Sequence, residues 1–381
     1  MRNVRNPFEY GGVVTGEAFC NRRKELADLL RAMENAEKLF VLSERRYGKT
    51  SLIRTALDRL PRRKFISAYV DLWPTDSETT FVAAVAKALT ESMSSSVNRL
   101  IETAKKFFGN LSPSITIDDD GKPNLSFGLA KHARIEPVLA EVLETPKKIA
   151  SKNGPRVVVV LDEFQQMLEY GSDRVERMLR SVIQNHHGVS YLFFGSRKHL
   201  IQKMVLDKNR PLYRAGGHYP LGPIAEREWQ PFIRKHFDSA TKRIDEQSIH
   251  EICEMTQGHP FYTQHLCHAL WELCEVRKGV TSELITAAVK LLLDRESYAY
   301  TTLWESLTLS QKRFLKGLAA EGAGVRVFAG EFVSRHGLSS ASNAQRAVDA
   351  LLGRDIIDRD NGSFVISDRF LRLWIQSAQT V

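Results

Sequence analysis

Three consecutive residues, Gly48-Lys49-Thr50, are the first in the chain whose types and order could do chemistry. The apolar run KLFVLS precedes them and a helical pattern follows, so they would lie in a tight loop between a strand and a helix. The free N–H groups at a helix start and the helix dipole attract anions. Glycine lets the backbone approach a phosphate, lysine can reach the β- and γ-phosphates of a nucleotide, and the threonine hydroxyl can ligate Mg²⁺.

The stretch around this tripeptide departs from the usual phosphate-binding pattern at one position. The pattern G-x-x-x-x-G-K-[ST] has glycine where this chain has Ser43, but that position needs only an ordinary strand-end conformation. We expect the two arginines in the variable middle of the loop to face solvent; the alternative is that they line the phosphate pocket. The predicted nucleotide contacts of the loop are Ser43, Glu44, Arg45, Arg46, Tyr47, Gly48, Lys49, Thr50 and Ser51.

A second group of residues with catalytic chemistry follows further along the chain. The apolar run VVVVLDEF ends in two carboxylates, Asp162 and Glu163. Asp162 would hold Mg²⁺ through water, and Glu163 would polarise the attacking water in phosphoryl transfer. The alternative is an ordinary acidic loop after a strand, but the upstream Gly-Lys-Thr sequence favours the catalytic interpretation.

A third apolar run ends in FFGSRK, which places Ser196 and Arg197 at the carboxyl edge of the same predicted sheet. Open α/β sheets bind their ligands at this edge. Arg197 would therefore contact the γ-phosphate; the alternative is an exposed arginine after a strand. Arg214 is a weaker candidate for a γ-phosphate contact, with a surface salt bridge the favoured interpretation.

The elements that must position these residues are strands alternating with helices. Continuous apolar strands separated by helical patterns predict a three-layer α/β fold with a parallel sheet and a P-loop core. We expect a helical region over residues 78–108 and a β-hairpin insertion near 114–129, with an Asp-Asp-Asp-Gly turn. The four expected strands are KLFVLS (38–43), FISAYVDLW (65–73), RVVVVLDEF (156–164) and VSYLFFGSRK (189–198).

The pattern changes twice after the last of these strands. Residues 225–300 carry helical patterns only, and from about residue 307 three short helices precede a hairpin around an Asp-Asn-Gly turn. Three helices and a hairpin describe a winged helix-turn-helix. The predicted domains are a P-loop core over 1–222, a helical lid over 223–303 and a winged helix-turn-helix over 304–381.

Composition restricts the class of protein further. The 381-residue chain has a net charge of +9, which is compatible with an anionic partner such as nucleic acid, a nucleotide or an acidic protein. Because its basic residues are scattered, a solvated basic surface without a dedicated partner is an equal alternative. It has no apolar run long enough for a membrane span and no recognisable secretory signal, so a cytoplasmic location is expected. Its cysteines are expected to be buried free thiols; a metal site at Cys267, Cys274, His265 and His268 is the less favoured alternative.

With these motifs in this order, the chain resembles the AAA+ superfamily of P-loop ATPases and, within it, the STAND class. Its greatest likeness is to the archaeal ATPase family, which occurs in archaea and bacteria. That family's phosphate loop is similar to ERRYGKTSL, and its Walker B and sensor 1 motifs resemble VVVVLDEFQQM and FFGSRK. PLYRAGGHYPLGPI is similar to the segment leading into the lid, and FVISDRFLRLWIQ to the winged-helix tail.

The resemblance implies nucleotide contacts outside the loop. The segment NPFEYGG and the following FCNRRKEL are similar to the family's amino-terminal box, which is expected to lie against the adenine through Asn6, Pro7, Phe8 and Arg22. TQGHPFYTQHL resembles the G-x-P motif of the STAND lid, in which Pro260 would contact the base.

The function implied by the resemblance is an ATPase switch. ATP or ADP would bind with Mg²⁺, Lys49, Glu163 and Arg197 would act in slow hydrolysis, and the nucleotide state would control the lid and the winged helix. The lid has no evident sensor 2 arginine, as in STAND proteins, which argues against a hexamer that borrows arginines between subunits. The ADP-bound protein is expected to be a monomer.

The alternative function is ATP-regulated binding of double-stranded DNA, in the manner of origin-recognition ATPases. Residues 305–381 carry ten Lys and Arg against eight Asp and Glu, a net charge of +2, which is small for a domain that must neutralise many phosphates. The predicted recognition helix offers few base-reading side chains beyond Asn343, Gln345 and Arg346. A protein partner for the winged helix is therefore favoured over DNA.

Overall fold

The computed structural model describes residues 5–20, 22–94, 96–117, 121, 123–150, 154–322, 324–360 and 362–377. The chain divides into two compact units. The sheet unit consists of Arg23–Ser43 and Leu52–Leu221, and the helical unit of Met1–Arg22, Glu44–Ser51 and Gly222–Val381. In the described part of the chain, no helix is both long and apolar enough to cross a membrane.

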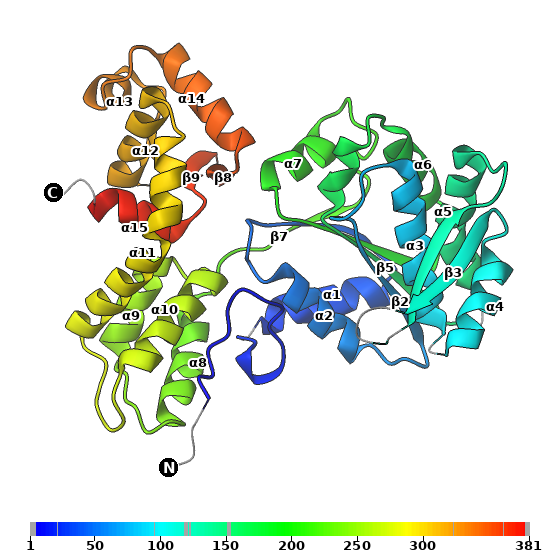
Figure 1. The fold of residues 1–381 in the computed structure, drawn as a ribbon, viewed down its shortest axis with the longest axis horizontal. Helices are drawn as coiled ribbons and strands as arrows, with labels where there is room; N and C mark the ends of the chain where they lie inside the picture. Colours follow the sequence, from blue (N-terminus) through cyan, green and yellow to red (C-terminus); the bar gives the residue numbers. More distant parts are fainter. Residues whose placement is uncertain are drawn as a thin grey trace. The chain divides into compact units, whose positions relative to one another are not determined.

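A five-stranded sheet is the centre of the sheet unit (Figure 1). Its strands are β1 (Lys38–Leu42), β2 (Phe65–Asp71), β5 (Arg156–Asp162), β6 (Val189–Gly195) and β7 (Gly217–Pro220). They lie in the order β2-β5-β6-β1-β7, and every neighbouring pair is parallel. The predicted parallel α/β sheet and its four expected strands are thus confirmed.

Both faces of this sheet are buried, which gives the unit three layers. Helices cover both faces (Figure 1), and α4 (Val97–Phe107) packs against α3 (Glu78–Met93) and the hairpin strand β3 (Leu111–Ile117). The other helices of the unit are α1 (Arg23–Glu34), α2 (Lys49–Arg59), α5 (Ile135–Ile149), α6 (Arg174–Ile183) and α7 (Lys198–Leu206). Along β5, Val157 and Val159 belong to the core formed with α3, α5, α6 and α7. Val158 and Val160, which point the other way, are also fully buried. Burial on both faces explains the unbroken run of valines.

Two features of the sheet unit go beyond the sequence prediction. The helical region expected over 78–108 is in two parts, because Ser94 is extended at the end of α3 and Ser96 precedes α4. Serine competes for backbone hydrogen bonds and favours helix ends. The edge strand β7 was not predicted, since its four residues GHYP are mostly exposed and end in proline, which only an edge strand tolerates.

The predicted hairpin insertion is present as a separate two-stranded antiparallel sheet. Its strands are β3 (Leu111–Ile117) and β4 (Pro123–Leu129). Leu125 is buried, and the ring of Phe127 lies edge-on to Phe108 at 5.7 Å. Asp118, Asp119 and Asp120 of the predicted turn lie outside the described residues.

Between β7, the last strand of the five-stranded sheet, and the winged helix the chain forms helices, as predicted, and these belong to the helical unit. They are α8 (Glu226–Asp238), α9 (Glu246–Thr256), α10 (Pro260–Leu273) and α11 (Ser282–Glu305). Proline begins α10, where its missing N–H leaves no helical hydrogen bond unmade. Gly258 just before it has φ 63°, and a Cβ there would lie 2.3 Å from the carbonyl oxygen of Ile224. Only glycine therefore fits this turn.

A winged helix-turn-helix forms the end of the chain, as predicted. It consists of α12 (Leu309–Glu321), α13 (Gly330–Arg335), α14 (Ala341–Gly353), β8 (Ile357–Asp360), β9 (Ser363–Ile366) and α15 (Arg369–Ser377). Thr308 begins α12 with a capping box to Gln311, and Ser340 caps α14. Asn361 of the expected turn between β8 and β9 lies outside the described residues.

Candidate nucleotide site

Three parallel strands bring their carboxyl ends to one edge of the sheet. β1, β6 and β5 are neighbours in that order, and Leu42, the last residue of β1, pairs with Gly195, the last residue of β6. β5 ends beside them at Asp162. The segments that follow these strands contain the predicted phosphate-binding and catalytic residues. The order of the strands therefore explains why motifs far apart in the chain are predicted to serve one site.

Asp162 is the most deeply buried carboxylate of this edge, with 3% of its surface exposed. It accepts hydrogen bonds from the Tyr69 hydroxyl and, at 3.0 Å, from the backbone N–H of Glu163. Burial and the neighbouring Asp162 charge raise the pKa of Tyr69, so the phenol stays protonated and donates. The guanidinium of Arg54 lies over the Tyr69 ring at 3.7 Å. Tyr69 was not predicted, because β2 carries no catalytic motif.

Glu163 is held by two donors in the same unit. Its backbone is left-handed, with φ 52°, and its Oε2 accepts from the Ser196 hydroxyl at 2.7 Å and from Nε2 of Gln165 at 2.5 Å. A Cβ on Gly195 would lie 2.2 Å from Oε1 of Gln165, so glycine there makes room for this network. The segment after β6 thus meets the acidic pair through Ser196. Arg197, the predicted phosphate contact, lies half-buried just before α7.

The phosphate-binding loop belongs to the helical unit from Glu44 to Ser51. Gly48 has φ 73°, a conformation that other residues rarely adopt, and α2 begins at Lys49 as predicted. The Lys49 ammonium is buried and donates to the carbonyl of Glu44 at 2.9 Å, which closes the loop on itself. Arg45 and Arg46 are exposed, and the Arg46 guanidinium lies over the Phe261 ring at 4.5 Å.

Residues before the sheet also fix the loop. The buried guanidinium of Arg22 donates to the carbonyls of Tyr47 at 3.1 Å and Gly222 at 3.0 Å. The hydroxyl of Ser51 accepts from the backbone N–H of Val14 at 2.8 Å. Arg22, placed in the adenine box by the resemblance, therefore also supports the phosphate loop.

The helical region contacts the loop through His259. Its Nδ1 accepts from the N–H of Phe261, so Nε2 carries the proton and donates to the carbonyl of Arg45 at 3.2 Å. Burial, and secondarily the positive charge of Arg369, hold the pKa of His259 well below its usual range. The imidazole is therefore neutral. His259 was not predicted, although it lies inside the quoted motif Gly258-His259-Pro260.

The winged helix contacts the loop through an ion pair. Nη2 of Arg369 lies 2.9 Å from Oε2 of Glu44, with only 5% and 8% of the two side chains exposed. Arg369 also donates from Nη1 to the carbonyl of Ile366 at 2.7 Å. The ring of the next residue, Phe370, packs 5.0 Å from Tyr262 of α10. Arg369 lies inside the quoted winged-helix tail FVISDRFLRLWIQ, but its contact with Glu44 was not predicted.

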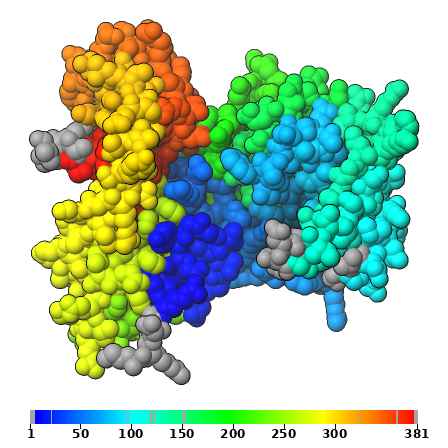
Figure 2. All heavy atoms as spheres, in the orientation of Figure 1, coloured from blue at the N-terminus to red at the C-terminus, as the bar shows by residue number. Residues whose placement is uncertain are grey.

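The remaining predicted contacts lie on the helical region. Asn6 donates to the carbonyl of His268 at 3.1 Å, and Phe8 is buried against Phe232 and Phe237. Figure 2 shows this amino-terminal segment, deep blue, against the yellow-green helices of the same unit. Pro7 lies between them, half-buried, and Pro260 is the first residue of α10. A role against adenine remains a prediction for these residues.

The proposed metal ligands are a carboxylate and a hydroxyl. Asp162 supplies buried oxygen atoms in the sheet unit, and Thr50 lies half-buried at the second position of α2. Within the described residues, no group of three His, Cys, Asp or Glu side chains could hold a metal. Mg²⁺ in phosphoryl-transfer sites takes only one or two protein oxygens beside the phosphates and water, and carboxylate and hydroxyl oxygens are donors of the kind it binds. A role for Asp162 and Thr50 in holding it stays a prediction.

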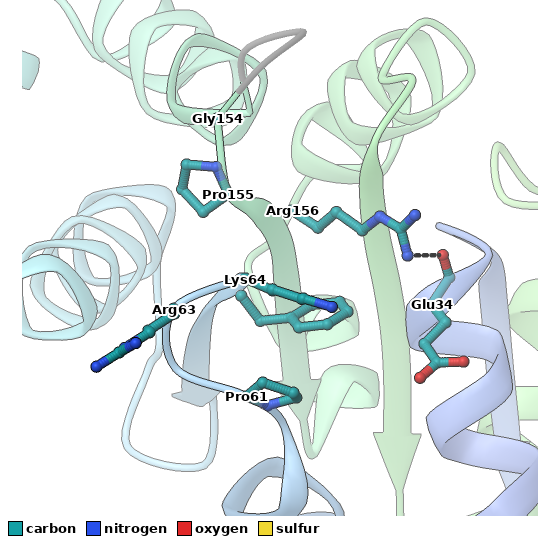
Figure 3. Close-up of a pocket in the computed structure, with 8 residues that line it drawn as sticks. Glu34, Pro61, Arg63, Lys64, Gly154, Pro155 and Arg156 are labelled. Atoms are coloured by element: carbon teal, nitrogen blue, oxygen red, sulfur yellow. Dashed lines mark hydrogen bonds between the residues drawn. The ribbon is translucent and has the colours of Figure 1, made fainter.

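A hollow on the sheet unit lies away from this edge. Its volume is about 540 Å³, and it is lined by Glu34, Pro61, Arg63, Lys64, Phe65, Gly154, Pro155 and Arg156 (Figure 3). Phe65 and Arg156 begin β2 and β5, so the hollow is at the amino edge of the sheet, opposite the acidic pair. Figure 3 shows Arg156 reaching the carbonyl of Glu34, at 2.8 Å. Arg63, Lys64 and Arg156 give the hollow an exposed basic lining beside the acidic Glu34, and it contains none of the predicted site residues.

The four cysteines are free and buried, as expected. Burial raises the pKa of Cys253 to about 12, and it raises the pKa of Cys267 as well. Thiols of this kind are packing residues rather than nucleophiles.

The parallel sheet, the phosphate-binding loop and the acidic pair define a P-loop ATPase fold, which is followed by a winged helix. Residues 19–266 match the model of the ATPase domain predominantly from Archaea, and residues 298–377 match that of a probable winged helix domain. The chain belongs to this archaeal ATPase family.

Solved structures support the same fold. A Walker-type ATPase of Pyrococcus abyssi aligns over 97% of this chain and 99% of its own, with a TM-score of 0.65 and 15% identity. The ORC2 protein of Aeropyrum pernix, in its ADPNP–ADP complexes, aligns over 100% and 99%, with a TM-score of 0.51 and 14% identity. A search of curated proteins finds no match to this chain.

Proposed function

We propose that this chain is a Mg²⁺-dependent ATPase switch of the STAND type, in which the bound nucleotide controls the lid and the winged helix. One observation carries the proposal: within a single compact unit, the phosphate loop bonds to the helical region at His259 and to the winged helix at Arg369. A ligand shifts a conformational equilibrium only if it binds the two states differently. Because the loop bonds to both regions, a nucleotide in the loop would bind with one affinity when these regions are in place and with another when they have moved.

The residues divide the chemistry as follows. Lys49, as a point charge, binds the β- and γ-phosphates, with the loop N–H groups around them. Mg²⁺, held by Thr50 and Asp162, would neutralise phosphate charge. Glu163, oriented by Ser196 and Gln165, positions the attacking water, and Arg197 contacts the γ-phosphate. Such positioning without an activator gives slow turnover, as a switch requires.

The same proposal includes the location of the protein, its oligomeric state, its partner and its adenine contacts. We place it in the cytoplasm, with the ADP-bound protein a monomer and a protein partner that engages the winged helix. Asn6, Pro7, Phe8 and Pro260 would line the adenine. The free thiols support a reducing compartment.

The test is phosphate release from ATP in the presence of Mg²⁺ and after its removal with EDTA, together with limited proteolysis. We expect slow, Mg²⁺-dependent release, and different cleavage of residues 305–377 with ADP and with a non-hydrolysable ATP analogue. Identical cleavage patterns in both nucleotide states would overturn the switch, even if ATP is hydrolysed.

ATP-regulated binding of duplex DNA is the second candidate, because winged helices dock in the major groove. The winged helix of this chain presents few groups for it. Gln345 bonds to Asp349 at 2.8 Å, and Arg369 is buried in its ion pair, which leaves Arg346 exposed on α14. Retention of a labelled duplex at 50 and 200 mM salt, with and without ATP, separates the two functions. Salt-sensitive, ATP-dependent retention would favour the DNA-binding function.

A further inference from the structure

Tyr69 lies on β2, the edge strand beside β5, and the register of the two strands directs it toward the predicted metal carboxylate. β2 pairs with β5 so that Asp71 is level with Asp162, and Tyr69 lies two residues earlier on its strand. Alternate residues of a strand point to the same face, so Tyr69 and Asp162 share one face of the sheet. The side chain must span about 7 Å along the strands to reach the carboxylate. The phenol does so, and its hydroxyl donates to Oδ2 of Asp162.

Two described donors hold the Asp162 carboxylate, one on each oxygen. The Tyr69 hydroxyl donates to Oδ2, and the backbone N–H of Glu163 donates to Oδ1 at 3.0 Å. Glu163 is the next residue of the chain, so its N–H moves together with Asp162. Tyr69 is 93 residues away on another strand, so it orients the carboxylate relative to the sheet.

The ring of Tyr69 is itself held by a cation. Ala68 and Val70 point to the other face of β2 and belong to the core formed with α3, so Tyr69 points away from that core. On its own side the guanidinium of Arg54, from α2, lies over the ring at 3.7 Å from the centroid. The ring's quadrupole attracts the cation, which keeps the phenol in place. A nearby positive charge also makes the hydroxyl a stronger hydrogen-bond donor.

A ligand of a metal ion depends on the groups that orient it. Carboxylates that bind metals are themselves hydrogen-bonded, and replacing such an outer partner typically lowers metal affinity by about 10- to 100-fold. Asp162 is 3% exposed, so protein groups rather than bulk water set the orientation of its carboxylate. Tyr69 has the properties of such an outer partner, because it contacts the carboxylate and is fixed by a residue of another element.

We propose that Tyr69 is a positioning residue for the metal ion. Held under the Arg54 guanidinium, its hydroxyl keeps the Asp162 carboxylate in the orientation that binds the hydrated Mg²⁺ of the Mg–ATP complex. A phenylalanine at this position would pack in the same way but would not orient the acid. This inference rests on the proposed function, because it assumes that Asp162 takes part in holding Mg²⁺.

The experiment measures how Mg²⁺ changes the binding of a fluorescent, non-hydrolysable ATP analogue to the full chain. The dissociation constant is determined in EDTA and then at increasing Mg²⁺. The Mg²⁺ concentration that gives half of the gain in affinity is compared between wild type and three variants. Thermal unfolding without nucleotide or Mg²⁺ reports whether each variant is folded.

The variants are Tyr69→Phe, Arg54→Gln and the control Tyr170→Phe. Tyr69→Phe removes one donor and leaves every other contact of the carboxylate in place. Tyr170 is a matched control because it is also a half-buried tyrosine of the sheet unit, and its hydroxyl bonds to Thr75 rather than to a carboxylate.

We expect Tyr69→Phe to need about tenfold more Mg²⁺ than wild type, while its affinity for the analogue in EDTA is unchanged. Arg54→Gln keeps the hydroxyl but loses the cation over the ring, so its shift should be smaller, about threefold. Tyr170→Phe should match wild type in both measurements. A purely structural role of Tyr69 would lower thermal stability without changing the Mg²⁺ requirement, so the Mg²⁺ titration separates positioning from packing.

A Mg²⁺ requirement of Tyr69→Phe equal to that of wild type would overturn the inference alone. Equal weakening of that variant in EDTA and in Mg²⁺ would also overturn it, because the tyrosine would then support the binding of the nucleotide rather than of the metal. If Tyr69→Phe does not fold, an unchanged Mg²⁺ requirement in Arg54→Gln would refute the inference. Wild-type protein whose affinity for the analogue is the same in EDTA and in Mg²⁺ would overturn the proposed Mg²⁺-dependent function and this inference together.

Discussion

The two parts of the candidate site differ in what holds them. Asp162 and Glu163 take their described partners from the sheet unit itself, from Tyr69 on β2 and from Ser196 after β6. Apart from the bond between Lys49 and Glu44 inside the loop, the described partners of the phosphate loop are distant in sequence. Arg22 is 25 positions from Tyr47, His259 is 214 from Arg45 and Arg369 is 325 from Glu44.

In a switch of the proposed kind, these two kinds of support would separate chemistry from control. The acidic pair is fixed by the strands of one sheet, so its geometry is as stable as the sheet. The loop is fixed by the helical region and the winged helix, and local opening of such contacts costs far less than global unfolding. The binding part of the site is therefore the part that other regions of the chain can regulate.

Replacing the loop lysine should have the largest effect. Lys49→Ala removes the charge that reaches the phosphates, and we expect loss of both ATP binding and turnover, by about 10³-fold or about 4 kcal/mol. Titration with labelled ATP measures it. Lys64→Ala, in the basic hollow at the other edge of the sheet, is the control and should bind normally. Equal losses in the two variants would show that the loop is not the site.

Replacing Glu163, the proposed base, should show most clearly that ATP binding depends on the phosphate loop and turnover on the acidic pair. Glu163→Gln keeps the shape of the side chain but cannot act as a base, so turnover should fall about 10²- to 10⁴-fold while ATP affinity is retained. Single-turnover phosphate release measures the loss. Glu169→Gln, at the exposed end of the same short 3₁₀ segment (Phe164–Glu169), is the control. Wild-type turnover in Glu163→Gln would refute the assignment.

Removing one hydrogen bond to that base should have a smaller effect. Ser196→Ala leaves the Glu163 carboxylate with Gln165 as its described side-chain donor, and we expect turnover to fall about tenfold, or about 1.4 kcal/mol. ATP affinity should not change, because the acidic pair is held independently of the loop. A weaker affinity with normal turnover would contradict the division between binding and chemistry.

The smallest expected effect is the response of the loop contacts to pH. Because the pKa of His259 is lowered in the folded protein, the unfolded chain binds more protons as pH falls below about 6.5. Its contribution to stability is present above that pH and is lost below it, by up to about 1.4 kcal/mol per pH unit.

His259→Asn tests this response, because asparagine can cap α10 but does not titrate. Thermal unfolding of the nucleotide-free protein between pH 7.5 and 5.5 should show a shallower decline for the variant. The other histidines whose pKa is lowered by burial titrate in both proteins and cancel in the comparison; they are His186, His218, His236, His265 and His268. Parallel pH curves would contradict the assignment of this response to His259.

Much of the fold follows from local sequence. The valine run of β5, the strand before Gly48-Lys49-Thr50 and the capped helices α12 and α14 each carry a pattern that burial or helix capping requires. Sequence patterns fail to predict an element where the pattern itself is weak. β7 is short and mostly exposed, and the break between α3 and α4 depends on a few serines.

Local sequence is enough to list the chemical groups of this protein and their order. The acidic pair follows the end of one strand, and the lysine and threonine follow the loop after another; the strand ends can be recognised because the apolar runs stop there. Only the tertiary structure decided which groups meet. The contacts of Tyr69, Ser196, His259 and Arg369 were not predicted, although all four lie in segments read from the sequence, and each gains its importance from a partner on another element. The physical reason is that hydrogen bonds and ion pairs act over a few ångströms, whereas their partners lie up to 325 residues apart.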